Sequence, residues 1–508
     1  MEQSAGQPKH HVTAPQDRIP LFQKVIYSIG AFANTAQAAF IGQMVIVLNL
    51  GLGVNPALVG LVGAIPRIID AISDPITGYF SDNLRTRWGR RRPLIFFGAV
   101  TGGILYALMY QLYKGHSESF YVWYFGVIQA LYFIGFTCFS IPWIALGYEM
   151  TPDYHERTRL QAASNFVGQL PWFIAPWCWA IMHNQAWFPD IVQGGRVLAI
   201  IIGITIVGFG ILPAIFNKEY FHTLPKPDVK GAWNVTKDFF AGGFVTLKCK
   251  PFRKLCLFTL LIFGGFMCAS AFTIYVVFFY VFKNAPVLDQ AYANGGLLLG
   301  IYGTFSAICT MGVIYLTTVL SRKLGKRNTF FITLPLSIIG YALKWIGYNP
   351  QHPYLLLVAA PFISFGLGSL FTLVSSMVAD VCDLDELTTD TRREGMFGAI
   401  YWWMVKVGVA ASSVISGFLL NLTGFDVALG LGQSARTLLN MRLCDIGIPI
   451  VTSTAAIFVI KTFSITEDKA YEIRAQVERR REERRREERR AEERREEERR
   501  KGERRDQG

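Results

Sequence analysis

Long apolar runs alternate with short polar stretches along most of this 508-residue chain. A helix of about 20 apolar residues crosses the ~30 Å hydrocarbon core of a bilayer. Twelve runs reach or approach that length, and they cover residues 21–50, 56–81, 93–113, 120–147, 160–182, 197–216, 255–282, 295–320, 330–346, 354–379, 396–420 and 446–463. The pattern therefore predicts an all-α integral membrane protein with twelve transmembrane helices.

The polar stretches repeat in register between two sets of six runs. SDNLRTRWGRRR follows the second run, and a degenerate copy, SRKLGKRN, follows the eighth. A repeat at equivalent positions is typical of a fold built from two related halves. We therefore expect two pseudo-symmetric six-helix halves, at residues 21–216 and 255–463, joined by a cytoplasmic linker at 217–254.

The two ends of the chain have different compositions. Residues 1–20 are polar and lack the basic, apolar and small-residue pattern of a cleavable signal, so they predict a disordered start. In the tail at 464–508, the stretch from residue 470 onward contains Glu and Arg at helical spacing with almost no apolar residue. This pattern predicts a solvated, charged helical tail. Attraction to anionic lipid headgroups is the alternative to a solubilising role.

Composition and charge narrow the class of protein. With 52% hydrophobic and 17% charged residues, the chain is too apolar for a soluble enzyme of this length. The net charge of +13 does not indicate a nucleic-acid partner, because 21 Lys and Arg lie in the loops on one side and 5 in those on the other. This asymmetry predicts a multi-pass protein of the cell membrane with both termini in the cytoplasm. Neither a phosphate-binding loop nor an enzyme motif stands out.

Three ionisable residues interrupt the second apolar run. On a helix, Arg67, Asp70 and Asp74 fall within roughly 60° of one another and share one face. Charged side chains at the centre of a membrane helix cost on the order of 3 kcal/mol each, so this face is expected to line a watery cavity. Two carboxylates four residues apart repel each other, and a small cation or a proton relieves that repulsion. The alternative is a structural clamp between Arg67 and Asp70.

Two segments carry a family resemblance. GYFSDNLRTRWGRRRP at 78–93 resembles the loop signature of the major facilitator superfamily, and DAISDP at 70–75 is similar to the glycoside-pentoside-hexuronide:cation symporters, of which the melibiose carrier is the best-known type. MVADVCDLDELTTDTRREGMFGAIYWWMVKVG at 377–408 resembles the tenth-to-eleventh helix segment of that family. The likeness covers roughly residues 20–463. The arginine-rich loop by itself also resembles plant-type sucrose transporters.

The resemblance implies roles for the charged residues. Four oxygen-bearing residues occupy the family's cation-site positions: Asp70, Ser73, Asp74 and Thr137. Asp70 and Asp74 would be metal ligands in a sodium-coupled carrier, and hydroxyls are oxygen ligands that a hard cation accepts. Lys406, together with Arg67, would couple charge by opposing the carboxylates when the cation is absent. The melibiose carrier has an amide where Ser73 stands, so Na⁺ and H⁺ both remain open.

The arginine-rich loop is expected to latch helix ends in one transport state. The candidate gating residues are Asp82, Arg85, Gly89, Arg90 and Arg91. Substrate recognition should differ from the melibiose carrier, which grips its galactoside with two carboxylates and an arginine where this chain has Thr35, Ser140 and Asn165. Polar and aromatic side chains would suit sugar hydroxyls and ring faces. The candidate substrate-binding residues are Asn34, Thr35, Ser140, Trp143, Asn165, Gln169, Trp172 and Trp402. For the tryptophans, helix packing is the alternative.

Together, the residues and the resemblance predict a secondary active transporter. We expect cation-coupled symport, with Na⁺ or H⁺, of a sugar, glycoside or uronide by alternating access, carried out by a monomer without a cofactor. The alternatives are a carrier of a lysolipid or other amphiphile and a non-transporting receptor on the same fold. The pair of Asp70 and Asp74 favours a transporter, because a receptor needs no coupling ion.

Overall fold

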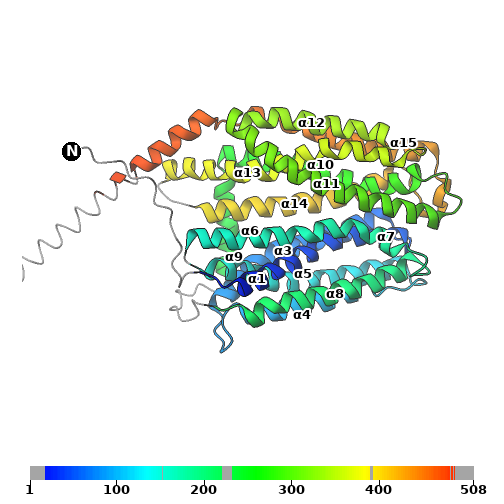
Figure 1. Ribbon diagram of the computed structural model, residues 1–508, viewed down its shortest axis with the longest axis horizontal. Helices are drawn as coiled ribbons and strands as arrows, with labels where there is room; N and C mark the ends of the chain where they lie inside the picture. The colour runs from blue at the N-terminus through cyan, green and yellow to red at the C-terminus, as the bar shows by residue number, and fades with distance from the viewer. Residues whose placement is uncertain are drawn as a thin grey trace, which may run out of the picture.

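The computed structural model describes residues 18–151, 153–219, 232–389 and 393–480, together with 482, 483 and 486. The described residues form helices and no named strand. The long helices run along the longest axis of the molecule and gather into two bundles, one of each half of the chain (Figure 1). The all-α transmembrane fold expected from the apolar pattern is therefore confirmed.

The first bundle contains the helices before the linker. They are α1 (Leu21–Met44), α2 (Val47–Leu50), α3 (Pro56–Asn83), α4 (Arg92–Met109), α5 (Glu118–Glu149), α6 (Tyr154–Ile174), the 3₁₀ turn η2 (Ala175–Trp177), α7 (Cys178–Met182) and α8 (Ile191–Phe216). Polar residues between the apolar runs begin several of them: the side chains of Asn55, Ser117 and Asp190 accept hydrogen bonds from the first turns of α3, α5 and α8.

The second bundle follows a short helix in the linker, α9 (Ala232–Leu247). It contains α10 (Lys250–Val276), the π-helical turn η3 (Val277–Val281), α11 (Leu288–Leu324), α12 (Lys326–Gly347), the 3₁₀ helix η4 (Pro353–Ala359), α13 (Ala360–Thr389), α14 (Glu394–Leu422), the 3₁₀ helix η5 (Val427–Gly432) and α15 (Ala435–Lys461). α10 begins at Lys250, so its first residues come from the expected linker.

Eleven helices of the described chain are long and apolar enough to cross a membrane. The one remaining predicted span, the fifth, at 160–182, is broken, because α6 ends at Ile174 and η2 and α7 complete it. Pro171 and Pro176 lie beside this break, where a missing backbone N–H weakens the helical ladder. With this segment, the structure has the predicted six spans in each half.

The two halves are packed together at one end of the molecule. We call the end that carries residues 84–91 and both described termini the arginine end, on the left in Figure 1, and the other the far end. At the far end one apolar cluster contains residues of both halves, including Trp179 and Phe278, whose ring centroids lie 5.5 Å apart. Tyr275 Oη also donates a hydrogen bond to Asn49 Oδ1 at 3.0 Å across the same boundary.

At the arginine end the buried apolar residues form separate clusters. Ile95 and Phe139 belong to a cluster of the first half, and Phe252 and Phe397 to one of the second half. The helix α9 runs transverse to the bundles at this end (Figure 1) and contacts α3 and α14. The direct packing between halves is therefore concentrated at the far end.

The charged tail begins with a docked helix. Residues 467–480 are helical, and Ile473 and Val477 are buried in the apolar cluster of the second half. An exposed ion pair joins Arg474 and Glu478 at 3.3 Å. The start of the tail thus carries an apolar seam, unlike the fully solvated helix expected from the sequence. The Glu/Arg repeat from residue 487 onward lies outside the described residues.

Candidate functional site

Lys406 of α14 lies between the two carboxylates of α3. Its Nζ is 2.9 Å from Asp70 Oδ2 and 2.5 Å from Asp74 Oδ2. The Asp70 side chain is 1% exposed, whereas those of Asp74 and Lys406 are 30% and 24% exposed. One ammonium group from the second half therefore compensates two carboxylates of the first half. The lysine stands where a counter-charge was expected.

The close approach of α3 and α14 brings these charges together. A Cβ atom on Gly60 would lie 2.3 Å from the carbonyl oxygen of Ser413, so the two backbones touch only because residue 60 is glycine. From this contact Lys406 is seven residues, about 10 Å, along α14, and Asp70 is ten residues, about 15 Å, along α3. The extended lysine side chain spans the difference.

Two hydroxyl groups complete the surroundings of Asp70. Thr137 Oγ1 of α5 donates a hydrogen bond to Asp70 Oδ1 at 3.1 Å. Ser73 Oγ lies 3.0 Å from Thr137 Oγ1 and bonds the backbone oxygen of Asp70 at 3.2 Å. The four predicted cation-site residues are thus neighbours, and their carboxylate and hydroxyl oxygens suit Na⁺ or a proton. Only two carboxylates meet here, and the described residues contain no group of three or more His, Cys, Asp or Glu side chains that could hold a metal ion.

The face of α3 opposite Asp70 is apolar and exposed. Leu61, Ile65, Ile68 and Ile72 follow one another at spacings of three and four residues, and each is between 42% and 59% exposed. They form a stripe about 180° from Asp70 around the helix. The exposed apolar stripe is the side that suits lipid, so the exposed part of Asp74 faces the space between the halves.

Arg67 does not form the clamp with Asp70 that was the structural alternative. Its guanidinium carbon lies 4.9 Å from the ring centroid of Phe133 on α5, a cation–π arrangement. Within the described residues no ion pair within 4 Å includes Arg67, whereas Lys406 contacts both carboxylates. Of the two cations predicted to balance the carboxylates, Lys406 therefore pairs with them and Arg67 packs against Phe133.

The candidate substrate residues of α6 share an exposed stripe. Asn165, Gln169 and Trp172 are all exposed and lie within about 60° on the helix. The apolar residues Phe166 and Leu170, exposed by 68% and 41%, are turned about 100° away from them. The polar stripe is therefore separate from the apolar one, as expected for a helix with one face toward water and one toward lipid.

Trp143 lies in the core of the first half. Its ring stacks on Tyr27 with centroids 4.9 Å apart, its Nε1 donates to the backbone oxygen of Tyr27 at 3.3 Å, and the residue is 6% exposed. This geometry favours the packing alternative for Trp143, and we do not retain it in the proposed substrate site. Trp402 of α14 is different, because it is 55% exposed and lies parallel to the Phe371 ring.

The remaining candidates lie on helices of the first half. Thr35 of α1 faces α6, since its Oγ1 would be 3.4 Å from a Cβ on Gly168. Ser140 of α5 is buried at 8% exposure. Asn34 is partly buried, and its Oδ1 has no hydrogen-bond partner among the described residues. An unpaired buried oxygen is costly unless water or a ligand satisfies it.

The candidate gating residues bind one another and the neighbouring helix ends of the first half. Arg91 bonds Asp82 Oδ1 at 2.5 Å, Ser81 Oγ at 2.7 Å and Glu149 Oε1 at 2.9 Å. Arg90 bonds the same Glu149 oxygen at 2.5 Å. Arg85 donates to the backbone oxygen of Asp82 at 3.1 Å. The loop thus ties α3 and α4 to the end of α5.

A carboxylate after α8 holds the start of α4. Glu219 accepts hydrogen bonds from the backbone N–H groups of residues 90, 91 and 92 at 2.7–2.8 Å. Gly89 has a φ of +115°, and a Cβ there would lie 2.5 Å from the Glu219 carboxylate. Sequence reasoning identified Gly89 but missed Glu149 and Glu219, because each is an isolated acid just after an apolar run.

We expect Glu219→Gln to lower the free energy of unfolding by about 1–2 kcal/mol, because it removes a charged acceptor at a helix N-terminus. The measurement is the midpoint of thermal unfolding in detergent. Glu478→Gln is the matched control, since an exposed i,i+4 pair contributes less than about 0.5 kcal/mol. Equal midpoints for the two variants would contradict the capping role.

The second half repeats this arrangement. Gly325, after α11, has a φ of +80°, and a Cβ there would lie 2.6 Å from the carboxylate of Glu467, which follows α15. Lys326 pairs with Asp380 of α13 at 2.7 Å, as Arg90 pairs with Glu149 of α5. The degenerate motif SRKLGKRN therefore corresponds to the arginine-rich loop in structure as well as in sequence.

A second charged cluster lies inside the second half and was missed by sequence reasoning. Lys344 of α12 pairs with Asp445 of α15 at 2.8 Å, and both are almost fully buried. Thr273 Oγ1 and Tyr348 Oη donate to the same carboxylate at 2.8 and 2.6 Å. All these groups belong to the second half, and their charges and hydrogen bonds are paired with one another. We therefore interpret the cluster as a structural clamp between α12 and α15.

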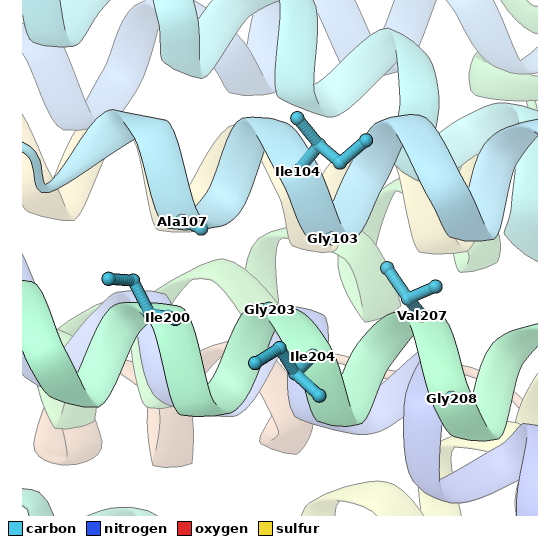
Figure 2. A pocket seen from close by; sticks show the side chains of 8 residues that line it. All are labelled: Gly103, Ile104, Ala107, Ile200, Gly203, Ile204, Val207 and Gly208. Carbon is cyan, nitrogen blue, oxygen red and sulfur yellow. The ribbon is translucent and has the colours of Figure 1, made fainter.

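An apolar groove of about 310 Å³ lies away from these charges, between α4 and α8. Ile104, Ile200, Ile204 and Val207 surround the place where Gly103 and Gly203 meet (Figure 2). Its lining is entirely aliphatic or glycine, so it offers no hydrogen bond to a sugar. None of the candidate substrate residues lines this groove.

Comparisons with known proteins agree on one family. A family model described as MFS/sugar transport protein matches residues 26–467. Similar curated proteins include an uncharacterized symporter of Synechocystis, 25% identical over 84% of this chain and 88% of that protein. A glucuronide carrier protein homolog of Escherichia coli is 23% identical, with 89% and 94% covered. An isoprimeverose transporter of Lactiplantibacillus pentosus is 21% identical, with 86% and 87% covered.

Solved structures share the fold. The inward-open xylose transporter XylE of Escherichia coli has a TM-score of 0.59 at 14% identity, over 89% of this chain and 98% of that one. A bacterial homologue of the lysosomal transporter Spinster has a TM-score of 0.60 at 13% identity, over 87% and 97%. At these identities the likeness establishes the fold alone.

Proposed function

Because this chain belongs to the MFS/sugar transport protein family, we propose that it is a secondary active transporter that couples the entry of a sugar-type substrate to Na⁺ or H⁺. The relatives named as symporters, a glucuronide carrier homolog and an isoprimeverose transporter support this class of function. The family model that matches the chain is described as a sugar transport protein, and eleven described helices are long and apolar enough to cross a membrane.

The observation that carries the proposal is the bridge from Lys406 to Asp70 and Asp74. A cation that binds between the carboxylates has to displace the lysine from one or both of them. The lysine belongs to the other half of the protein, so cation binding would change a contact between the halves. Such an exchange links ion binding to the motion between halves that alternating access requires.

The packing of the halves is compatible with a state of that cycle that is closed at the far end. With the arginine end in the cytoplasm, the closed apolar cluster at the far end would block the outer side, and the separate clusters at the arginine end would leave the inner side able to open. Asn165, Gln169, Trp402 and Thr35 would contact the substrate between the halves. The loop at residues 84–91 would keep the inner ends of the first half in one rigid unit.

Uptake by proteoliposomes tests this function. A panel of neutral glycosides, pentosides and sugar acids is supplied with an imposed Na⁺ gradient, H⁺ gradient or neither. We expect at least one compound to accumulate above its outside concentration with one gradient only. Binding of panel compounds without accumulation under any gradient would instead indicate a receptor. The lysolipid alternative gains no support from the named relatives.

We expect Lys406→Ala to change the cation dependence of uptake more than the affinity for substrate. Without the ammonium, two carboxylates repel each other unless a cation binds, so the cation concentration for half-maximal uptake should fall by at least about tenfold. The substrate concentration for half-maximal uptake should change much less. Lys326→Ala, which removes a lysine paired with Asp380 inside the second half, is the control. A loss of substrate affinity alone would move Lys406 to the substrate site.

A further inference from the structure

Four formal charges meet where α3 and α14 approach each other. Asp70 and Asp74 carry two negative charges, Lys406 carries one positive charge that contacts both, and Arg67 carries a second positive charge one turn from Asp70. The four sum to zero. Adding one Na⁺ or one proton to the carboxylates brings the sum to +1.

A net charge in this setting is costly. Asp70 is 1% exposed, and the neighbouring Thr137 and Phe133 are buried at 0% and 3% exposure. A charge inside a membrane protein is stable when it is paired, bonded or in contact with water. A cation-loaded site that then accepts a neutral substrate keeps the extra charge, whereas a monoanionic substrate cancels it.

Arg67 is the cation in position to receive that anion. In the described chain its guanidinium has no ion-pair partner within 4 Å and stacks on the ring of Phe133. The Arg67 residue is partly buried, so water reaches only part of it. A guanidinium with five donors and no acceptor binds a carboxylate with two parallel hydrogen bonds.

A neutral polar group without a partner lies on α5, the helix that packs against Arg67. Gln129 of α5 shares the face of Phe133, one turn away, is 3% exposed, and its Oε1 has no partner among the described residues. Asn34 of α1, a helix that contacts α5, also has an unpaired Oδ1. Such oxygens accept hydrogen bonds from hydroxyl groups. A carboxylate site beside hydroxyl acceptors matches one chemical class, a sugar acid.

We propose that Arg67 binds the carboxylate of a monoanionic sugar substrate, so that one coupling cation and one substrate anion load the site without changing its net charge. The inference rests on the proposed symport function and adds the substrate class and the residue that selects it. Binding is then ordered by electrostatics: the cation displaces Lys406, the site becomes positive, and the anion follows. Each transport cycle moves no net charge.

The test compares two substrates that differ only in the charged group. Proteoliposomes receive p-nitrophenyl β-glucuronide or p-nitrophenyl β-glucoside at equal cation gradient, with the membrane potential clamped at zero or made negative inside with potassium and valinomycin. We expect the glucuronide to be the better substrate and its uptake to be independent of the potential. Glucoside uptake, where measurable, should rise with a negative inside, because each cycle then carries one positive charge.

Variants of Arg67 separate recognition from structure. Arg67→Gln should raise the half-saturating glucuronide concentration by roughly 10- to 100-fold, the value of one lost charge-assisted pair. The glucoside value should not rise, because the cation-loaded site without Arg67 carries no excess charge. Arg67→Lys should recover part of the loss. Arg87→Gln, at an exposed position of the loop, is the control and should behave as the unmodified protein. Purely structural damage would reduce uptake of both substrates equally.

The outcomes distinguish this inference from the proposed function. Cation-driven accumulation of the glucoside but not of the glucuronide would overturn the role of Arg67 and leave symport intact. Equal loss of both substrates in Arg67→Gln, or glucuronide uptake that follows the potential, would also overturn it. Failure of every compound in the wider sugar panel to accumulate under any gradient would overturn the proposed function and the inference with it.

Discussion

Asp70→Asn is expected to abolish gradient-driven accumulation of substrate while the protein still folds. The change removes the buried negative charge that faces Lys406 at 2.9 Å, and the asparagine can still accept the hydrogen bond from Thr137. Without Asp70, Lys406 and Asp74 form a balanced pair, and a cation would have one carboxylate ligand instead of two. Losing one buried charged partner costs about 2–5 kcal/mol of binding, so cation affinity should fall by roughly 30-fold or more. Lys406 keeps its contact with Asp74, so the two halves remain joined at this level.

The measurement is uptake with and without the imposed gradient in the same vesicles. In Asp70→Asn the internal substrate concentration should reach only passive equilibrium, and Asp74→Asn should show the same loss. Asp289→Asn, at an exposed position in the first turn of α11, is the matched control. Full accumulation by both carboxylate variants would refute their assignment as the coupling site.

Gly296→Val is expected to give the second large effect, by preventing closure of the far end. A Cβ on Gly296 would lie 2.8 Å from backbone atoms of Trp179 and Ala180 in the other half. Backbone cannot move aside as a flexible side chain can, and overpacking of this kind costs about 1–3 kcal/mol or more. The closed state should become roughly 10- to 100-fold rarer relative to the open one, and uptake should fall accordingly.

A cysteine reporter can follow this closure. Asn49 is 1% exposed and bonded to Tyr275 across the boundary, so Asn49→Cys should be protected from a membrane-impermeant maleimide. Adding Gly296→Val should increase its labelling rate. Gly312→Val on the same helix is the control, because a Cβ at Gly312 meets no atom within 4 Å. Slow labelling and normal uptake in the Gly296 variant would mean that closure tolerates the valine.

Local patterns in the sequence were enough to predict the membrane fold. Apolar run length depends on the thickness of the bilayer and on neighbouring residues only, so the six spans of each half could be read directly. The break at 171–176 follows from proline, which acts on the helix that contains it. Asp70 and Asp74 on one face of α3 follow from the helical repeat. The loop motif that recurs in the two halves could also be recognised from the sequence, because each copy is a local run of residues.

The tertiary structure decided which charges meet. Asp70 could have paired with Arg67, three residues away on the same helix. It pairs instead with Lys406, which also contacts Asp74 over a separation of 332 residues, because α3 and α14 approach each other at Gly60. The same holds for Lys344 and Asp445, because an isolated lysine near the end of one apolar run and an isolated aspartate just before another gave no local signal.

Packing also separated the aromatic residues. The chain alone established that Trp143 and Trp402 lie in apolar runs, but only the arrangement of helices buries the first against Tyr27 and exposes the second. The sequence determined the helices, their faces and the residue types that carry charge, because these follow from short-range periodicity. The partners of each charge, and the end at which the halves close, were decided by the tertiary structure, because they depend on contacts between helices far apart in the chain.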